Sequence, residues 1–324
     1  MKKRKWKTIG FSLLGIVVLA VAVLGYEYYQ LQPKNHFKSV PVVSSGKASG
    51  TTPANETVEV KEPVFNLLLI GSDERKGEKI GHSDSMMLVH VDINKHKYNA
   101  MSIPRDTRVF LDGYGYTKLT SVQYIMQATK GSQQGVEAAV HAVSELTGVP
   151  INYYVETNYG GFQAMVDAIG GIDMEVPYQV TLTHPWFREN KNKVISPGTH
   201  FFDGKMVSEV VHERYSLADG EYGRQKLQEE ALKGIAKKAL SPTNITKLPS
   251  LVKSIPDFVT ATNMTTSDML SLGLAAKDFN PDTQLSYLQV PGEWKRLYDD
   301  ILKANNDQLV IDQKKIKDLV SVNF

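Results

Sequence analysis

Residues 64–71 read VFNLLLIG, an unbroken apolar run of the length that one buried strand needs. Two more apolar runs follow at residues 85–93 and 96–103, and the dipeptide Asn94-Lys95 interrupts the pattern between them. A two-residue break between two strand patterns predicts a β-hairpin. These three runs therefore predict the middle of a β-sheet.

Strand and helix patterns alternate through the rest of the chain. Gly148, with Pro150 beyond it, is a typical signal for the end of a helix. Further strands are predicted at residues 151–156, 172–176 and 285–290, and helices at residues 119–130, 136–146, 159–169, 204–213 and 223–240. Strands and helices mixed in one continuous run predict a single layered α/β domain over residues 63–324.

The N-terminal residues differ in composition from this domain. Residues 8–25 read TIGFSLLGIVVLAVAVLG and carry no charge, which predicts one transmembrane helix near the lower limit of length. The basic residues 1–7 before it and the tyrosines after it place the N-terminus in the cytoplasm and the domain outside the cell. A cleaved signal peptide is the alternative. No clear small-x-small cleavage site follows the apolar run before the tyrosines and Gln30, so an uncleaved single-pass anchor is favoured.

Residues 26–62 separate the anchor from the domain. They are poor in large apolar side chains and include SSGKASGTTPANE at residues 44–56. Such a composition predicts a flexible extracellular linker with a reach on the order of 30 Å. The domain should therefore stay close to the outer leaflet of the plasma membrane, where a lipid-linked substrate would be within reach.

Charge and composition exclude several classes of function. The chain has 37 basic and 35 acidic residues, and five of the basic ones lie in the first seven residues. The remaining 32 basic residues against 35 acidic ones leave a charge near −3, which argues against nucleic-acid binding. No cysteine is present, which excludes disulfides, a thiolate zinc site and a cysteine nucleophile.

Two aspartates flank the first two predicted strands. Asp73 follows the first strand, and Asp84 begins the second within the sequence His82-Ser83-Asp84. If the strands are neighbours, the two carboxylates meet at one edge of the sheet. Two carboxylates with waters and phosphate oxygens suit Mg²⁺. Aspartates that merely cap turns are the alternative.

Basic side chains follow in two further segments. Arg105 and Asp106 come directly after the third strand in SIPRDTR, residues 102–108, and Lys118 lies just past a DGYG turn. A guanidinium at that position can bind two phosphate oxygens at once. A salt-bridged turn is the alternative interpretation of this segment.

The second basic segment joins two predicted helices. His212 and Arg214 end one helix, Arg224 begins the next, and Gln228 lies four residues further on the same helical face. An ordinary solvated helical face would give the same pattern. The sequence contains no Walker-type phosphate loop, no G-x-S-x-G elbow and no HExxH motif.

The order of these motifs resembles the LytR-CpsA-Psr family of cell-envelope proteins. NLLLIGSDER, HSDSMMLVHVD, MSIPRDTRV, DGYGYTKL, GVPINYYVETNYGGF, DAIGGIDMEVP, GTHFFDG and YGRQ follow one another in the family's order over about residues 65–240. Each motif alone is weak, but the ordered set is specific. The resemblance implies a three-layer α–β–α sandwich with a mixed central sheet.

The resemblance also implies an activity. Family members look like extracellular, Mg²⁺-dependent phosphotransferases. They move a glycopolymer, such as wall teichoic acid, from an undecaprenyl-pyrophosphate carrier to peptidoglycan in Gram-positive bacteria. By the same resemblance the polyprenyl tail lies in an apolar tunnel, and arginines hold the pyrophosphate.

Site residues follow from the resemblance position by position. Asp73 and Asp84 match the carboxylates for Mg²⁺ or Mn²⁺, and Arg105 matches the arginine of the PRD motif. Arg214, Arg224 and Gln228 match the later pyrophosphate-binding residues, to which Lys118, His82 and His212 are added as further candidates. The sugar hydroxyl is the expected nucleophile, and Asp84 or Asp106 is the candidate base.

Three positions depart from the family pattern. His82 and His212 stand where arginines are usual, and Leu227 stands where an arginine usually precedes the glutamine. Histidine carries a full charge only below about pH 6.5. A site with fewer cations leaves two alternatives open beside the ligase: a polyprenyl-pyrophosphate phosphatase, or a lipid-pyrophosphate-binding protein. A transcriptional attenuator is a further alternative, and the external topology argues against it.

Overall fold

The computed structural model describes residues 25–45, 56–75 and 77–324. The predicted cytoplasmic tail and nearly all of the predicted transmembrane helix lie outside these described residues. Among the helices that the structure describes, none has the length and apolar character needed to cross a membrane.

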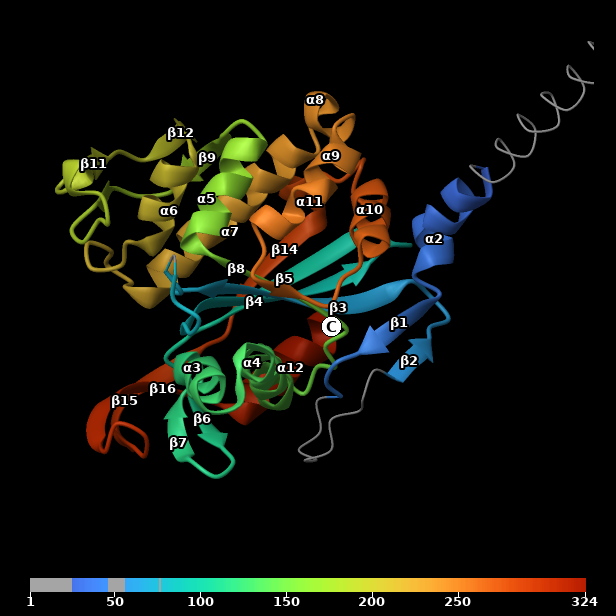
Figure 1. Ribbon diagram of the computed structural model, residues 1–324. Helices are drawn as coiled ribbons and strands as arrows, with labels where there is room; N and C mark the ends of the chain where they lie inside the picture. Colours follow the sequence, from blue (N-terminus) through green and yellow to red (C-terminus); the bar gives the residue numbers. More distant parts are fainter. Residues whose placement is uncertain (1–24, 46–55, 76) are drawn as a thin grey trace, which may run out of the picture.

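A six-stranded mixed sheet forms the centre of the fold (Figure 1). The strands lie in the order β13-β8-β3-β4-β5-β14. β3 pairs antiparallel with β4, and β4 pairs antiparallel with β5, whereas β8 and β14 run parallel to their neighbours β3 and β5. The bounds are β3 (Val64–Ser72), β4 (Ser83–Asp92), β5 (Lys97–Ile103), β8 (Tyr153–Asn158), β13 (Ala261–Thr262) and β14 (Leu285–Gln289).

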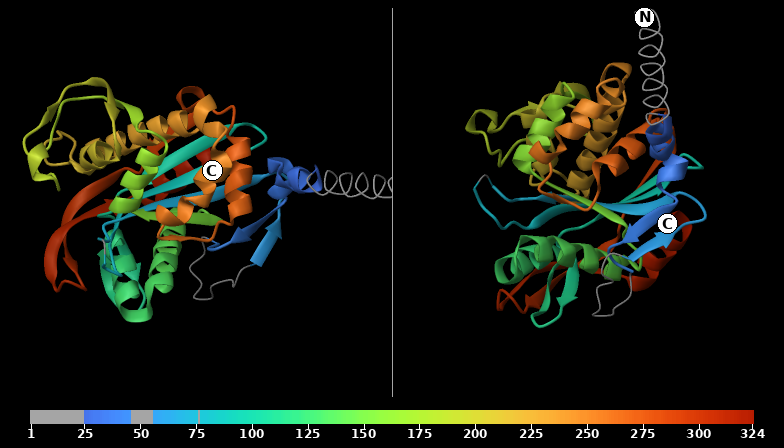
Figure 2. Two further views of the ribbon diagram at one scale, coloured as in Figure 1. Left: turned by 45° about the horizontal axis from the view of Figure 1, so that its top comes forward. Right: turned by 45° about the vertical axis from the view of Figure 1, so that its right-hand side comes forward.

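Helices cover both faces of this sheet, so the α/β prediction with a mixed sheet is confirmed (Figures 1 and 2). In Figure 1 the upper layer contains α5 (Tyr159–Ala168), α6 (Gly204–His212), α7 (Glu221–Ala239), α8 (Pro242–Ile245), α9 (Leu248–Lys253), α10 (Thr266–Ala275) and α11 (Pro281–Gln284). The lower layer contains α3 (Leu119–Lys130), α4 (Ser132–Thr147) and α12 (Gln313–Asn323).

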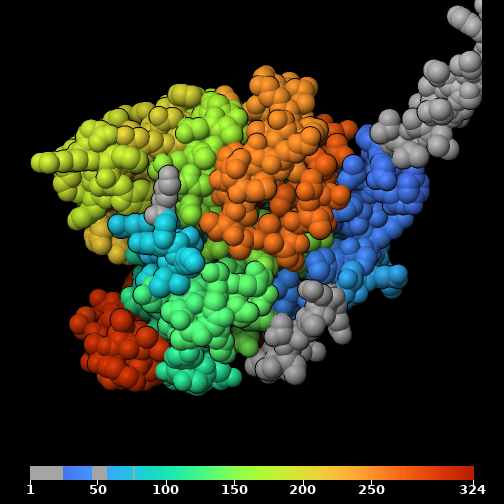
Figure 3. Space-filling model, in the orientation of Figure 1, coloured from blue at the N-terminus to red at the C-terminus, as the bar shows by residue number. Residues whose placement is uncertain are grey.

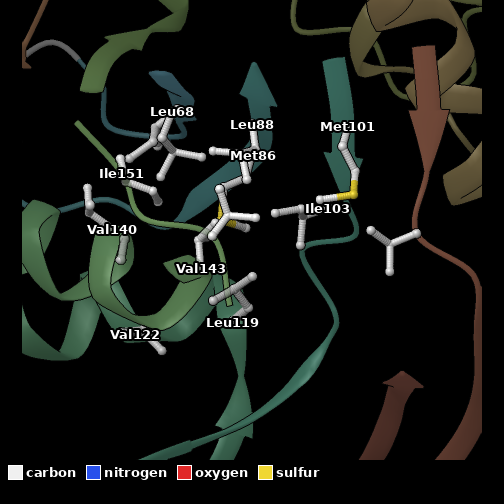
Figure 4. Packing of buried hydrophobic residues seen from close by; sticks show 14 of the residues in the cluster. Leu68, Met86, Leu88, Met101, Ile103, Leu119, Val122, Val140, Val143 and Ile151 are labelled. Atoms are coloured by element: carbon white, nitrogen blue, oxygen red, sulfur yellow. The ribbon is translucent and has the colours of Figure 1, made fainter. Parts of the chain in front are cut away.

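Apolar side chains from the strands meet those of the lower helices in one core cluster. Figure 4 shows Leu68, Leu88 and Met101 of the sheet above Val140 and Val143 of α4. Fully burying a side chain of this size contributes about 1.5–3 kcal/mol. The alternation of strand side chains explains why the apolar runs have to be nearly continuous: both faces of β3, β4 and β5 are covered.

Separate two-stranded sheets accompany the central sheet. β6 (Arg108–Leu111) pairs with β7 (Gly115–Lys118), and β15 (Gly292–Asp299) pairs with β16 (Ala304–Ile311), next to each other below the sheet (Figure 1). The remaining pairs are β9 (Ile172–Val176) with β12 (Gly198–Phe202), β10 (Val180–Thr181) with β11 (Val194–Ile195), and β1 (Ser39–Val42) with β2 (Glu56–Glu59). Short 3₁₀ helices cover Arg188–Asn190 and Ile255–Asp257.

Most predicted elements occur near their predicted bounds. The helix predicted at residues 119–130 is α3 with the same bounds. The predicted hairpin is confirmed, but its turn is longer: β4 ends at Asp92 and β5 begins at Lys97. His96 in this turn has a φ of 49°. A left-handed residue closes the longer turn, which a two-residue break in hydropathy does not reveal.

The prediction of a flexible linker over residues 26–62 is wrong for its described part. Residues 25–31 are helical, α2 (Pro33–His36) follows, and β1 pairs with β2. Phe37 is fully buried, with its ring 4.7 Å from that of Phe65. The segment is poor in apolar residues on average, yet single residues such as Phe37 and Val40 complete the core. Residues 46–55 lie outside the described residues.

Candidate functional site

The candidate residues meet at one edge of the sheet, where β3 and β5 end and β4 begins. Asp84 lies on β4, and the segment that holds Arg105 and Asp106 follows β5 directly. The loop between α6 and α7 brings Arg214 to the same place from the upper layer, and the first turn of α7 brings Arg224. Sequence segments separated by more than one hundred residues therefore form one site.

Asp84 is the central carboxylate of this site. It is buried and forms ion pairs with Arg105 and Arg224, and the Arg224 pair measures 2.8 Å. The Tyr159 hydroxyl donates a hydrogen bond to the same carboxylate at 2.9 Å. Burial raises the pKa of Tyr159 to about 12, so this phenol stays a donor at neutral pH.

Arg224 is almost completely enclosed by protein. Its guanidinium donates to the Asp84 carboxylate, to the Asp84 backbone carbonyl and to Glu221, each at 2.8 Å. Glu221 reaches Arg224 because side chains three residues apart share a helical face. Among the buried polar atoms that the structure describes, Nε of Arg224 and Nε of Arg105 lack a hydrogen-bond partner. The second carboxylate oxygen of Glu221, beside Arg224, is a buried acceptor that also lacks a partner.

Asp106 forms a second acidic centre, which shares Arg105 with Asp84. Lys118 donates to it at 2.7 Å, and Arg105 and Arg214 each approach its other oxygen to 3.9 Å. Arg105 thus lies between the two aspartates. Burial, and after it the charges of Arg224 and Arg214, lower the pKa of Arg105 from the ordinary arginine value.

A cavity of about 140 Å³, here called the arginine cavity, lies among these cations. Its lining residues are Arg105, His184, His212, Glu213, Arg214, Tyr215 and Arg224. Guanidinium groups that converge on a concave space are suited to bind phosphate oxygens. The prediction that Arg105, Arg214 and Arg224 act together therefore agrees with their placement.

His212 lines this cavity without adding a charge to it. Its Nδ1 lies 3.1 Å from the Tyr159 hydroxyl, and its ring packs 4.6 Å from that of Trp186. Burial, followed by the charges of Arg224 and Arg105, lowers the pKa of His212 to about 4. At neutral pH it is an uncharged hydrogen-bonding group.

Asp73 and His82 form a separate pair beside the site. The His82 backbone N–H donates to Asp73 at 2.6 Å, and the His82 ring stacks on Tyr124. Burial acts to raise the pKa of Asp73, but the bonds from His82 outweigh it and keep that pKa below its usual value. Asp73 and Asp84 lie at the same end of the paired strands β3 and β4, as predicted.

Asp73 and Asp84 are the two carboxylates that the sequence predicted for a magnesium ion. Mg²⁺ is held in many proteins by one or two carboxylates together with substrate phosphates and water. Asp73 keeps a partly exposed carboxylate at this edge, whereas both oxygens of Asp84 contact guanidinium groups. Within the residues that the structure describes, no group of three or more acidic or histidine side chains forms a metal site.

A larger cavity of about 290 Å³, the apolar cavity, opens next to Asp84 between the sheet and the upper helices. Most of its lining is apolar and comes from β3, β4, α5 and α7, including Leu69, Met87, Phe162, Met165 and Ile235. Gln228 also lines this cavity, beside Asp84 and Tyr159. Gln228 is therefore placed toward the apolar cavity and not in the lining of the arginine cavity.

Leu227 is fully buried in the apolar cluster of the upper layer. It packs with residues such as Ile172, Met174 and Val207, which belong to the same cluster. A leucine at this position suits its surroundings, and an arginine here would need a partner that the cluster does not supply.

Two further residues complete the environment of Asp84 and Arg224 and were not predicted from the sequence, namely Tyr159 and Glu221. Tyr159 directly follows β8, the strand beside β3, so its position at a strand end is the signal that could have found it. Glu221 could have been found from its i, i+3 spacing to Arg224.

A family model described as the LytR_cpsA_psr family matches residues 30–322. The match covers α2, the central sheet, every site residue and all but the last residue of α12. This chain belongs to that family.

Named relatives in the LytR_cpsA_psr family cover most of the chain. The polyisoprenyl-teichoic acid–peptidoglycan teichoic acid transferase TagU of Bacillus anthracis is 29% identical over 292 residues, which are 90% of this chain and 88% of the relative. Biofilm regulatory protein A of Streptococcus mutans is 30% identical over 217 residues, which are 64% of this chain and 52% of the relative.

Solved structures share the fold. The crystal structure of TagV from B. subtilis has a TM-score of 0.66 at 23% identity and covers 81% of this chain and 96% of that chain. TagT bound to LI-WTA has a TM-score of 0.62 at 23% identity and covers 87% of this chain and 94% of that chain. Both likenesses support the mixed-sheet architecture of this LytR_cpsA_psr protein.

Proposed function

We propose that this protein is a phosphotransferase that attaches a glycopolymer, of the wall teichoic acid type, from a polyprenyl-pyrophosphate carrier to peptidoglycan. The observation that carries the proposal is the position of Asp84, which lines one cavity and forms ion pairs with two arginines that line another. One cavity is apolar, and the other is lined by Arg105, Arg214 and Arg224. The teichoic acid transferase name of the 29% identical relative supports the same activity.

Each cavity binds a different part of the donor. The polyprenyl tail enters the apolar cavity, where burial of its methylene and methyl groups provides the hydrophobic contribution to binding. The pyrophosphate lies in the arginine cavity, which Arg105, Arg214 and Arg224 line. The tail thereby places the phosphorus atoms beside the guanidinium groups.

The reaction needs no protein nucleophile. A sugar hydroxyl oxygen of peptidoglycan forms a bond to the sugar-bearing phosphorus, and the bond from that phosphorus to the bridging oxygen breaks. Polyprenyl monophosphate leaves with the bond's electron pair. Catalysis in such transfers comes mainly from positioning and from charge stabilisation by cations, which the arginines supply.

Asp106 is the base in this proposal. The proton of the attacking hydroxyl has to be accepted as the new bond forms. Both oxygens of Asp84 contact guanidinium groups, whereas one oxygen of Asp106 has only the two more distant arginines at 3.9 Å. Lys118, on the other oxygen, holds the Asp106 carboxylate in place.

Mg²⁺, held by Asp73 and Asp84 together with phosphate oxygens, is part of the proposal. Mn²⁺ prefers the same oxygen ligands. A bound divalent cation would supply further charge stabilisation on the pyrophosphate.

The proposed location is the outer surface of a Gram-positive cell membrane. Residues 8–25 would anchor the chain with its N-terminus in the cytoplasm. The domain would then lie on the side where peptidoglycan and the lipid-linked donor meet.

Replacement of Arg105 by Ala tests the site. Removal of one charge-stabilising donor typically costs about 10²–10³-fold in turnover. We expect a loss of that size in transfer of a lipid-linked polymer to peptidoglycan, measured with the full-length protein in Mg²⁺. Arg188→Ala is the matched control, because Arg188 is exposed and does not line the site. Equal activity of the Arg105 variant and wild type would refute the assignment.

A polyprenyl-pyrophosphate phosphatase is the second candidate, and the uncharged His212 favours it. A site with fewer cations can bind the donor and let water attack. We expect phosphate transfer to depend on acceptor if the ligase proposal is right. Release of the same product at the same rate without peptidoglycan would favour the phosphatase, and binding without turnover would favour a lipid-pyrophosphate-binding protein.

A further inference from the structure

A third cavity of about 390 Å³ adjoins the site and shares no lining residue with the apolar cavity. Its lining consists of Asp106, Lys118, Arg214, Trp294 and Asp307, and it is here called the tryptophan cavity. Arg214 lines both this cavity and the arginine cavity, so the two are neighbours at that side chain. An aromatic ring among charged hydrogen-bonding groups distinguishes it from both other cavities.

The tryptophan ring is exposed but its strand is held firmly. Trp294 is 48% exposed on β15, which pairs with β16. The Leu309 backbone N–H of β16 donates to the carbonyl of Asp106 at 2.9 Å. Asp299 accepts a bond from Thr117, and Asp300 accepts one from the Tyr116 N–H. The hairpin is thereby fixed to the segment that carries Arg105 and Asp106.

The arrangement of the hairpin is visible in the figures. β15 and β16 lie beside β6 and β7 below the sheet, whereas α5 and α7 of the apolar cavity lie above it (Figures 1 and 2). In Figure 3 the red surface of the hairpin projects beside the green surface of the lower layer. Trp294 and the apolar cavity therefore belong to different layers, with Arg105 between Asp84 and Asp106.

The chemistry of this lining matches a sugar ring. A pyranose has an apolar face of C–H groups that can cover an exposed aromatic ring, and an indole offers a large rigid surface for it. Its hydroxyls donate to carboxylates and accept from ammonium or guanidinium groups. Trp294 supplies the first interaction, and Asp307 and Lys118 supply the second.

The direction of the reaction assigns that sugar. In phosphoryl transfer the attacking and leaving oxygens lie roughly in line on opposite sides of the phosphorus. The leaving polyprenyl phosphate is on the side of the apolar cavity, so the attacking hydroxyl has to come from the other side. The tryptophan cavity is the candidate for that side, because it shares no lining residue with the apolar cavity and contains Asp106, the proposed base.

We propose that the tryptophan cavity is the binding subsite for a sugar of the peptidoglycan glycan strand, with Trp294 as its stacking platform and Asp307 as a hydroxyl acceptor. The inference rests on the proposed transferase function and deepens it. Trp294 and Asp307 are positioning residues for the acceptor.

Binding of a soluble glycan fragment tests the subsite without requiring turnover. The probe is a fragment of alternating N-acetylglucosamine and N-acetylmuramic acid, titrated into the full-length protein and followed by calorimetry. We expect Trp294→Ala to weaken binding about tenfold or more, as for a central aromatic contact, and Trp294→Phe to retain most of it. Tyr298→Ala is the matched control, because Tyr298 lies on the same strand with 49% exposure and does not line the cavity.

Kinetics supply the second readout. We expect Trp294→Ala to raise the KM for the acceptor while the KM for the lipid-linked donor and kcat at saturating acceptor stay unchanged. Asp307→Asn should shift the same constant in the same direction, which guards against a folding defect in the tryptophan variant. Thermal unfolding of each variant is measured in parallel.

Three outcomes would overturn the inference. The first is that Trp294→Ala binds the fragment as tightly as wild type. The second is that Trp294→Ala and Tyr298→Ala weaken binding equally. The third is a change in the donor KM alone, which would assign the cavity to a sugar of the donor. A wild-type protein that binds the fragment through Trp294 but transfers no polymer would refute the proposed function and leave the subsite standing.

Discussion

Arg224 is the largest side chain among those that are fully buried in the described structure. A buried guanidinium persists because Asp84 and Glu221 compensate its charge. We expect Arg224→Met to lower the free energy of unfolding by about 3–5 kcal/mol, because it leaves two buried carboxylates without their partner. Urea denaturation monitored by circular dichroism measures this loss.

Arg214→Met is the comparison for that variant. Arg214 is partly exposed and approaches Asp106 only to 3.9 Å. A pair of this kind contributes at most about 1 kcal/mol to stability. We expect transfer activity to fall in both variants but stability to fall only in Arg224→Met. An equal loss of stability in the two would contradict the role assigned to burial.

His212 predicts a pH dependence of stability. Its pKa is about 4 in the folded protein and about 6.5 in the unfolded chain, so between these values the unfolded chain binds more protons. The contribution of His212 is therefore complete above about pH 6.5 and is lost as pH falls toward 4, by at most about 3 kcal/mol. Melting temperatures from pH 4 to 7 measure the effect.

His212→Gln is the control for this titration. Glutamine keeps a hydrogen-bonding group near Tyr159 but does not titrate. We expect the variant to lose less stability than wild type as pH falls through this range. Parallel curves for the two proteins would show that His212 is not protonated on unfolding.

Charged candidates were found from sequence where they directly follow strands or flank a helix boundary. Arg105, Asp106 and Arg224 were chosen in this way, and the structure brings them together through ion pairs with Asp84 and with each other. Trp294 and Asp307 could not be found, because their hairpin approaches the site through tertiary contacts such as the bond from Leu309 to Asp106. Gln228 was on the predicted helix, but its cavity depends on how α7 lies over the sheet.

The contact between α3 and α4 depends on Gly135. A Cβ at this position would meet the side chain of Gln127 and lie 2.9 Å from the Gln123 carbonyl oxygen. We expect Gly135→Ala to lower the free energy of unfolding by about 1–3 kcal/mol, because the helices would have to move apart. Thermal and urea unfolding measure the change.

Gly160 in α5 is the matched control for that helix pair. A Cβ there would have its nearest neighbour at 3.6 Å, the side-chain oxygen of Asn158. We expect Gly160→Ala to be neutral or to stabilise by about 0.4–1 kcal/mol, because alanine restricts the unfolded chain. If both variants were destabilised by the same amount, the loss would come from replacing any helical glycine and not from the close packing of α3 against α4.

Elements were predictable in proportion to the strength of their hydropathy pattern. α3, β3 and β9 combine a clear pattern with clear end signals, and they occur at or near their predicted bounds. β15 and β16 carry many polar residues on a partly exposed hairpin, so no apolar run marked them. Short pairs such as β10 with β11 depend on tertiary contacts and have no local signal.

The whole domain includes the segment that precedes β3. Phe37 packs against Phe65 and Tyr153 in the core between the sheet and α10. We expect Phe37→Ala to lower the free energy of unfolding by about 3–5 kcal/mol. We further expect a chain that begins at residue 61 to unfold at a lower temperature than one that begins at residue 25.

Tyr28→Ala is the control for the first of these changes, because Tyr28 is 62% exposed in the neighbouring helical segment. Differential scanning calorimetry compares the four proteins. Equal melting temperatures for the two chain lengths would show that residues 25–60 do not belong to the folding unit.

The attachment of this segment has a consequence for rotation. Ser271 of α10 donates to the Leu31 carbonyl at 2.9 Å, and His36 lies 2.7 Å from Asp268. These contacts therefore fix the direction in which the chain enters the domain, and the connection is not a flexible one. A dye placed at Tyr26 should therefore tumble with the whole domain in time-resolved anisotropy. If the protein is held at a surface through its N-terminus, these contacts would set the orientation of the arginine cavity relative to that surface.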